Sequence, residues 1–273
     1  MTGKPGRGFL KWAGGKFDLI NHIRAVMPNG RVLIEPFAGS GAVFVNTNFD
    51  KNILADTNRD LISIYLILQR HGAQFIVDAS ELFVARNNSE KRYYSFRKQF
   101  NSSHDDYERA LLFLYLNRHC YNGLCRYNQS GQFNVPFGRF KSARFPDIEL
   151  HKFYIKSKLA TFTCEDFETT MKRARKNHIV YADPPYVPLS DTANFTSFTA
   201  EKFNMEKQKQ LAECAKKASA RGATVLISNH DTPFTRKLYA GAEIRSFSAR
   251  RRISRDGANR TPVKELIAIY AAK

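Results

Sequence analysis

The sequence predicts an α/β fold in which a mostly parallel sheet carries helices on both faces and is interrupted by a helical insertion. Short apolar runs typical of buried strands alternate with segments whose apolar residues recur at helical spacing. Between about residues 80 and 145 this alternation gives way to a helical pattern. We therefore expect an α/β domain at residues 1–56 and 146–273, and a helical insertion at residues 57–145 with a hairpin near 126–137.

Six apolar runs are expected to form strands, because each is long enough for a strand and too short for a helix. Helices are expected between them at residues 59–70, where Leu61 and Leu68 lie on one face, and at residues 205–221. Gly222 follows the second helix and suits its C-terminus. The expected strands are residues 31–35, 52–56, 179–183, 224–229, 244–248 and 265–270.

The insertion is expected to contain helices at residues 92–100 and 107–119, followed by a hairpin that turns at residues 130–131. A helical subdomain with no further role is the alternative interpretation. However, its second half is rich in aromatic residues, and residues 109–146 include no Asp or Glu. This composition favours a recognition module.

Net charge is the strongest compositional signal. The chain has 43 Lys and Arg residues against 25 Asp and Glu, a formal net charge of +18. Such an excess favours a polyanionic partner, and solubility alone explains it less well. A second basic stretch covers residues 245–264, and neither stretch has the pattern of an amphipathic helix at a membrane surface. We therefore expect nucleic acid, and no membrane, as the partner.

Neither targeting segments nor metal motifs are expected. The N-terminus has no signal-peptide pattern, and no apolar run has the length needed to span a membrane. The four cysteines form no Cys-x-x-Cys pair, and the histidines show no metal-ligand spacing. We expect a protein of a reducing, cytoplasmic compartment with no metal site and no disulfide framework.

The segment Asp183-Pro184-Pro185-Tyr186 follows a predicted buried strand. Two consecutive prolines exclude a helix and remove two backbone donors, which leaves a rigid corner. The aromatic ring could stack on a planar base, while the carboxylate and a proline carbonyl accept hydrogen bonds from an exocyclic amine. A simple turn at the end of a strand is the alternative interpretation. The complete tetrapeptide at a strand end favours a site.

A glycine-containing loop at residues 35–41 follows the first predicted strand. It lacks the nucleotide fingerprint G-x-G-x-x-G, and the chain has no phosphate-binding G-x-x-x-x-G-K-[ST] motif. Asp56 ends the next strand, where an acidic residue commonly accepts hydrogen bonds from a ribose. Together these features favour a nucleoside cofactor without a pyrophosphate, and S-adenosylmethionine fits. The alternative for Asp56 is an N-cap before a helix at Arg59.

Together these segments resemble the DNA adenine-N6 methyltransferases of the Dam type. The motifs occur in the family's order, over nearly the whole chain from about Phe9 to Tyr270. They are Lys-Trp-Ala-Gly-Gly-Lys at 11–16, Glu-Pro-Phe-Ala-Gly-Ser-Gly at 35–41, Tyr-Asn-Gly-Leu-Cys-Arg-Tyr-Asn at 121–128, Asp-Pro-Pro-Tyr at 183–186 and Leu-Ile-Ser-Asn-His-Asp at 226–231.

The resemblance implies an S-adenosylmethionine-dependent methyltransferase fold: Rossmann-like, with a mostly parallel seven-stranded sheet and a helical plus β-hairpin insertion that recognises DNA. It implies transfer of a methyl group from S-adenosyl-L-methionine to the N6 amine of a flipped-out adenine in double-stranded DNA containing GATC. A bacterial, nucleoid-associated enzyme or a phage protein in the host cytoplasm is expected, with no obligatory protein partner.

The resemblance also implies the roles of individual residues. Asp183, Pro184 and Tyr186 match the catalytic corner. The residues that match cofactor contacts are Trp12, Lys16, Phe37, Gly39, Gly41, Asp56, Asp166, Phe167 and Asp183. Those that match DNA contacts are Lys11, Tyr121, Asn122, Leu124, Arg126 and Pro136, and the basic stretches add Arg139, Arg250, Arg251 and Arg252. Family members often have tyrosine where this chain has Phe140.

Elementary chemistry gives these residues specific tasks if they contact DNA as the resemblance implies. An adenine amine is buried in the duplex, so the base must be extruded at a cost of a few kcal/mol. Tyr121 and Leu124 could wedge into the gap that remains. Arg126 could read a guanine edge, although a phosphate contact is an equal alternative without the family match. The second basic stretch is expected to grip the backbone, with a hairpin tip at residues 255–258.

Two rival functions remain open. A methyltransferase could act on another planar amine: cytosine N4, guanine N2 in RNA or a glutamine side-chain amide. Asp183 as the first residue of the corner, in place of Ser or Asn, follows the family pattern for adenine. Alternatively, the protein could occupy DNA without performing chemistry. The intact corner, the glycine loop and Asp56 disfavour such a DNA-binding relic, which would also fail to bind S-adenosylmethionine.

Overall fold

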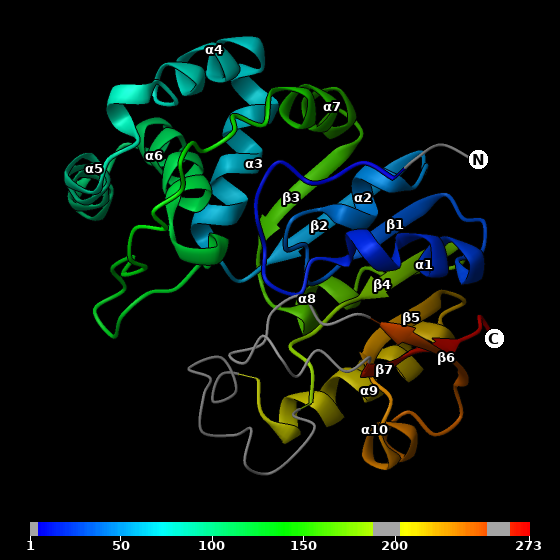
Figure 1. The fold of residues 1–273 in the computed structure, drawn as a ribbon. Helices are drawn as coiled ribbons and strands as arrows, with labels where there is room; N and C mark the ends of the chain where they lie inside the picture. Colours follow the sequence, from blue (N-terminus) through cyan, green and yellow to red (C-terminus); the bar gives the residue numbers. More distant parts are fainter. Residues whose placement is uncertain (1–4, 188–202, 250–262) are drawn as a thin grey trace. The chain divides into compact units, whose positions relative to one another are not determined.

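A seven-stranded sheet organises the fold (Figure 1). The computed structural model describes residues 5–187, 203–249 and 263–273. Within these residues the strand order is β3-β2-β1-β4-β5-β7-β6. The strands are β1 (Val32–Glu35), β2 (Lys51–Asp56), β3 (Ala160–Cys164), β4 (His178–Ala182), β5 (Thr224–His230), β6 (Glu243–Ala249) and β7 (Val263–Tyr270).

The direction of the strands confirms the predicted, mostly parallel sheet. β1 pairs in parallel with β2 and β4, and β4 pairs in parallel with β5. β7 runs antiparallel between β5 and β6. Ala182 at the end of β4 is in register with Ile227 of β5. The segments that leave β1, β4 and β5 therefore emerge at the same edge of the sheet, where open α/β sheets bind their ligands.

The described chain divides into two compact units. The first unit comprises residues 1–20, 39–48 and 56–164, and the second comprises residues 21–38, 49–55 and 165–273. This division differs from the expected one, because residues 1–20, 39–48 and 146–164 group with the helical insertion. One reason is a pair of hydrogen bonds between Asn117 and Lys11, which are too far apart in sequence for a local pattern to indicate. The buried Asn117 amide accepts from the Lys11 N–H over 2.8 Å and donates to the Lys11 carbonyl over 2.7 Å.

The second unit carries helices on both faces of its strands. Buried Leu211, Ala215 and Ala218 of α9 pack in one core cluster with Leu266 and Ala268 of β7. Residues on the opposite face of the antiparallel strands meet α1, where the His22 and Phe247 rings stack with centroids 4.8 Å apart. The helices of this unit are α1 (Ile20–Val26), α8 (Phe167–Met171), α9 (Met205–Ala220) and α10 (Pro233–Leu238).

The first unit is mostly helical (Figure 1). α3 buries Leu61, Ile64, Tyr65 and Leu68, as its predicted periodicity requires. The expected helices at 92–100 and 107–119 lie within α5 and α6. The elements of this unit besides β3 are η1 (Lys16–Leu19), α2 (Ala42–Asn46), α3 (Arg59–His71), α4 (Ala73–Glu81), η2 (Ala85–Asn87), α5 (Glu90–Ser102), α6 (Asp106–His119), η3 (Tyr121–Gly123) and α7 (Asp147–Ser157).

A hairpin follows α6 and η3. Tyr127 and Phe133 form an isolated antiparallel bridge, and the Asn128 N–H donates to the Gln132 carbonyl over 2.9 Å. The Asn128 carbonyl accepts from the Gly131 N–H over 3.0 Å, and Gly131 has a φ of +72°. A three-residue loop that ends in a left-handed glycine fits this geometry. The tip expected at residues 255–258 lies outside the described residues.

Among the described residues, no helix is long and apolar enough to cross a membrane.

Candidate active site and nucleic-acid interface

The Asp183-Pro184-Pro185-Tyr186 corner leaves β4 at the carboxyl edge of the parallel strands in the second unit. β4 is buried except at its first residue, since parallel neighbours cover both of its sides. The following prolines then end the strand, because they cannot donate to its neighbours. Pro184 is buried, whereas Asp183 and Tyr186 are half-buried. The corner therefore presents one carboxylate and one aromatic ring from a rigid backbone.

Tyr186 is held by two residues outside the motif. Its hydroxyl donates to Glu265 Oε2 of β7 over 2.9 Å, and its ring meets the His230 ring edge-on with centroids 4.9 Å apart. Burial raises the pKa of the Tyr186 phenol well above its ordinary value, and the nearby Asp183 carboxylate raises it further. Tyr186 therefore stays protonated near neutral pH. Its ring is available for stacking, but the phenol cannot act as a base.

A buried amide network supports the backbone of the corner. Asn229 Oδ1 accepts from the Val187 N–H over 3.1 Å, and Asn229 Nδ2 donates to the Tyr239 hydroxyl over 2.9 Å. Gln208 Nε2 of α9 donates to the Pro185 carbonyl over 2.7 Å. No sequence motif predicted these roles for Asn229 and Gln208, or the role of Glu265. Asn229 lies in the recognised Leu-Ile-Ser-Asn-His-Asp motif, and its place near the end of a buried strand was a usable signal.

We expect Asn229→Ala to lower the free energy of unfolding by about 3 kcal/mol, because it leaves buried donors and acceptors without partners. Urea denaturation followed by circular dichroism measures the change. Asn204→Ala is the matched control, since the Asn204 amide only caps the exposed start of α9 and should cost about 1 kcal/mol. Equal losses in the two variants would show that the amide network does not support the corner.

Three aromatic rings gather beside the same edge in the second unit. Phe37, which follows β1, stacks on Phe167 with centroids 5.6 Å apart, and Phe203 packs edge-on against Phe37 at 5.5 Å. Asp166 precedes Phe167 and caps α8, because its Oδ1 accepts from the Thr169 N–H over 2.8 Å. This hydrogen bond lowers the pKa of the Asp166 carboxyl. Asp166 is thus ionised and exposed beside an aromatic surface.

In the first unit, Asp56 organises the turn that follows β2. Its Oδ2 accepts from the Gly39 N–H over 3.1 Å, and its Oδ1 accepts from the Asn58 N–H over 3.0 Å. The alternative role as a helix N-cap is wrong, because the Asn58 side chain caps α3 by accepting from the Leu61 N–H. Burial raises the pKa of the Asp56 carboxyl, and these backbone donors oppose that rise. Asp56 is thus a fixed, largely buried carboxylate that caps no helix.

Trp12 lies against the backbone of Gly39. A Cβ atom at Gly39 would come within 3.1 Å of Trp12 Cδ1, and the φ of Gly39 is +46°. Both observations explain a glycine at this position. The Tyr65 hydroxyl donates to the Gly39 carbonyl, and the buried Lys16 ammonium donates to the Gly14 carbonyl over 2.6 Å. The first unit thus brings the indole, the ordered glycine backbone and Asp56 together; Gly41 caps α2 with a φ of +66°.

A compact loop carries Tyr121 and Asn122. Asn122 has a φ of +53°, which a non-glycine residue seldom adopts, and Tyr121 leaves 53% of its surface exposed. The Tyr121 N–H donates to the Pro136 carbonyl over 2.9 Å, which ties the loop to the hairpin. A side chain at Gly123 would overlap the Lys11 stem. This packing brings Lys11 beside the 121–123 loop although more than a hundred residues separate them.

The Lys11 ammonium is held in place from two sides. It lies 4.0 Å from the centroid of the Phe140 ring and donates to the Arg118 carbonyl over 3.1 Å. Burial lowers the pKa of Lys11, and the charge of Arg118 adds to this effect. The cation–π contact uses the ring face alone, so it does not require the hydroxyl of a tyrosine at position 140. Phe140 therefore retains a direct contact with Lys11.

Arg126 lies exposed on the hairpin, oriented by its neighbour across the turn. Arg126 Nε donates to Asn134 Oδ1 over 2.8 Å. Leu124 lies in the loop before the hairpin, Pro136 lies in the hairpin, and Arg139 follows it. Arg250, Arg251 and Arg252 lie outside the described residues.

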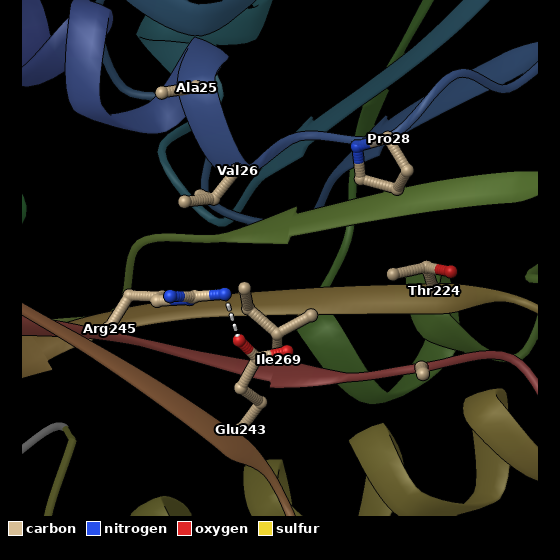
Figure 2. A pocket seen from close by; sticks show the side chains of 8 residues that line it. Ala25, Val26, Pro28, Thr224, Glu243, Arg245 and Ile269 are labelled. Carbon is tan, nitrogen blue, oxygen red and sulfur yellow. Dashed lines mark ion pairs between the residues drawn. The ribbon is translucent and has the colours of Figure 1, made fainter.

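A separate pocket of about 530 Å³ lies between the end of α1 and the antiparallel strands (Figure 2). Glu243 and Arg245 of β6 form an ion pair in its wall. Thr224 begins β5 and Ile269 lies near the end of the antiparallel β7. The pocket is therefore at the edge opposite to the Asp183 corner and takes no part in the candidate active site.

The chain matches a family model over residues 12–253, and the model describes the D12 class N6 adenine-specific DNA methyltransferases. The chain belongs to this family. Among curated relatives, the DNA adenine methylase of Escherichia coli (strain K12) is 50% identical over 98% of this chain and 96% of its own length. The DNA adenine methylase of Serratia marcescens is 51% identical over 98% and 99% of the two chains. Among solved structures, an rRNA methylase from Streptococcus thermophilus aligns over 95% of this chain and 97% of its own, with 6% identity and a TM-score of 0.36.

The protein is therefore an adenine-specific DNA methyltransferase. Burial raises the pKa of Cys120 to about 12 and that of Cys125 to about 11, so neither thiol is a thiolate near neutral pH. Neither is suited to act as a covalent nucleophile. Among the described residues, no cluster of His, Cys, Asp and Glu could hold a metal ion.

Proposed function

We propose that this methyltransferase transfers a methyl group from S-adenosyl-L-methionine to the N6 amine of a flipped-out adenine within GATC in double-stranded DNA. The Asp183-Pro184-Pro185-Tyr186 corner carries the proposal, because it presents a carboxylate and a stacking ring at the ligand-binding edge of the sheet. The family assignment supports adenine as the target base. The curated relatives are named DNA adenine methylases, which also supports adenine in DNA, whereas GATC follows from the resemblance of the motifs to the Dam type.

The residues present fit the cofactor. Asp56 offers a fixed carboxylate for ribose hydroxyls, and Gly39 lets Trp12 lie close to the backbone, where a Cβ atom would come within 3.1 Å of the indole. When bound, S-adenosyl-L-methionine supplies an electrophilic methyl group on a sulfonium. We propose that Trp12, Lys16, Gly39, Gly41 and Asp56 of the first unit, and Phe37, Asp166, Phe167 and Asp183 of the second, contact the cofactor. The Phe37–Phe167 surface suits an adenine ring, beside which Asp166 accepts hydrogen bonds.

The corner residues orient the target amine. Tyr186 stacks on the extruded base, held by Glu265 and His230. The Asp183 carboxylate and the Pro184 carbonyl accept the two amine hydrogens. The adenine amine is conjugated with its ring and is a poor nucleophile, so these acceptors restore electron density at nitrogen and aim its lone pair. Orientation and electrostatics then supply most of the rate enhancement.

The first unit reads the sequence. We propose that Tyr121 and Leu124 fill the gap left by the flipped base, and that Arg126 reads a guanine edge with a discrimination of about 1–3 kcal/mol. Lys11, Asn122 and Pro136 contact neighbouring bases, while Arg139 contacts the backbone. Because its substrate is DNA and its relatives are bacterial, the enzyme is proposed to act in the cytoplasm of a bacterium, including a bacterium infected by a phage.

Neutralising Arg250, Arg251 and Arg252 together should weaken DNA binding equally for all sequences, because phosphate contacts carry no base information. The slope of log K against log salt concentration should decrease by up to about 0.9 for each phosphate that is no longer neutralised. Fluorescence anisotropy at several salt concentrations measures both quantities. Loss of GATC preference with an unchanged salt slope would instead assign these arginines to base reading.

Transfer of tritiated methyl groups to paired duplexes tests the proposed function. The duplexes differ only in GATC against GTTC. Label should enter the GATC duplex alone and be recovered as N6-methyladenine. If neither duplex is labelled although the cofactor binds, the adenine of GATC is not the target. If the cofactor does not bind, the chain is a DNA-binding relic.

A further inference from the structure

Tyr127 joins the recognition hairpin to the first turn of α3. The Tyr127 hydroxyl donates to Asp60 Oδ2 over 2.6 Å. Arg109 of α6 donates to the other carboxylate oxygen, Asp60 Oδ1, also over 2.6 Å. The side chains of Arg109 and Asp60 are only 24% and 12% exposed, so water competes little with this pair. Arg109 thereby holds the Asp60 carboxylate in place, and this carboxylate in turn holds the Tyr127 hydroxyl.

Cys125 provides a second link between the same two segments. Asn58 Nδ2 donates to Cys125 Sγ over 3.4 Å, and the Cys125 thiol donates to the Tyr127 hydroxyl oxygen over 3.7 Å. Burial raises the pKa of Tyr127, and the neighbouring Cys125 and Asp60 raise it further. The phenol therefore stays protonated and remains a donor. Two side chains, at alternate positions of the hairpin, bind it to the start of α3.

Arg126 lies between these two anchored residues. In an extended segment successive side chains point to opposite sides. Cys125 and Tyr127 are half-buried against α3, whereas Arg126 is exposed. A bidentate contact with a base edge needs the guanidinium plane in one orientation. The hydrogen bonds of the Arg126 side chain go to Asn134, which belongs to the same hairpin, so the anchoring of its neighbours decides where the hairpin presents it.

Asn58, which bonds Cys125, also belongs to the turn that holds Asp56, the carboxylate proposed to bind the ribose. Asn58 caps α3 through the Leu61 N–H and donates its own N–H to Asp56. Asn58 therefore takes part both in anchoring the hairpin that carries Arg126 and in the turn that holds Asp56. A displaced hairpin would leave Asp56 in place, because Gly39 and Asn58 still donate to its carboxylate from the backbone.

We propose that Tyr127 is a positioning residue for base reading, which holds Arg126 against its guanine through the hydrogen bond to Asp60. This rests on the proposed function, in which Arg126 reads a base edge. Tyr127 itself need not contact DNA. It acts through the rigidity that Asp60 and Arg109 give to the hairpin.

Specificity profiles of three variants test the inference. The value of kcat/KM is measured on a GATC duplex and on duplexes in which each base pair of the site is changed singly. Arg126→Ala identifies the base pair that Arg126 reads. Tyr127→Phe should reduce discrimination at that same pair about tenfold, which is about 1.4 kcal/mol, and leave the other pairs and cofactor affinity unchanged. Tyr107→Phe is the matched control, since it removes a Tyr–Asp hydrogen bond of 2.6 Å elsewhere in the same unit.

The outcomes separate this inference from the function on which it rests. Undiminished discrimination in Tyr127→Phe, or an equal loss at every base pair, would overturn the positioning role while wild type and Arg126→Ala still support the function. No GATC preference in wild type, or no effect of Arg126→Ala, would overturn both. Asp60→Asn provides a second route, because it removes the charge that Arg109 and Tyr127 share; it should weaken discrimination at the same pair.

Discussion

Asp183→Asn should lower kcat about a thousandfold and leave GATC binding intact, because a neutral amide no longer draws the amine hydrogens as a carboxylate does. The substitution preserves the shape of the corner, so the change reports on charge and not on packing. Single-turnover methylation of a GATC duplex measures the rate of the chemical step, and anisotropy measures binding of the same duplex.

Asp50→Asn is the matched control for this prediction. Asp50 is an exposed carboxylate of the same unit, 3.8 Å from Arg31, and its removal should not change the rate. If Asp183→Asn methylates DNA at the wild-type rate, the corner does not orient the amine. If it instead abolishes DNA binding, Asp183 serves recognition and the assignment of the catalytic residue is incorrect.

Asp56→Asn should weaken binding of S-adenosyl-L-methionine by about 3 kcal/mol, about a hundredfold in Kd, because two charge-assisted hydrogen bonds to the ribose are lost. Isothermal titration calorimetry without DNA measures this affinity. The raised pKa of Asp56 adds a pH signature. The ionised form binds the ribose, so affinity in wild type should decrease as the pH falls toward the raised pKa, and this dependence should vanish in the variant.

Asp106→Asn is the matched control for Asp56→Asn. Asp106 begins α6 in the same unit, is 59% exposed in its side chain, and lies 3.6 Å from Arg59. Its loss should leave cofactor affinity unchanged at every pH. An unchanged affinity in Asp56→Asn would remove Asp56 from the cofactor site and leave the turn after β2 with a purely structural role.

The strands and helices that were predicted correctly have a clear hydrophobic pattern in their own sequence. β1, β4 and β5 each contain a run of three apolar residues, and α3 repeats its buried residues at helical spacing. β3 gave no such signal, because it is an edge strand in which only Phe162 is fully buried. α7 was also missed, since Ile148 and Ile155 on it are exposed and blur its periodicity. Edge position and partial burial are tertiary properties that a local pattern does not contain.

The candidate site was predictable where a motif carries its own geometry. The corner at 183–186 is fixed by its prolines. Asp56 could be chosen as a candidate because it is the acidic residue at the end of a predicted strand. The supports of the corner were not predictable, because Glu265 and Gln208 reach it from distant parts of the chain. Nothing in the local sequence distinguishes these side chains from surface polar residues.

A library of duplexes that contains every four-base sequence would decide the proposed reaction and its specificity together. The duplexes are methylated by the enzyme with S-adenosyl-L-methionine and then sequenced by a method that detects N6-methyladenine at single-base resolution. We expect N6-methyladenine at GATC and an unmodified adenine in every other context. Methylation spread over other adenines, or found on cytosine, would contradict the proposed function.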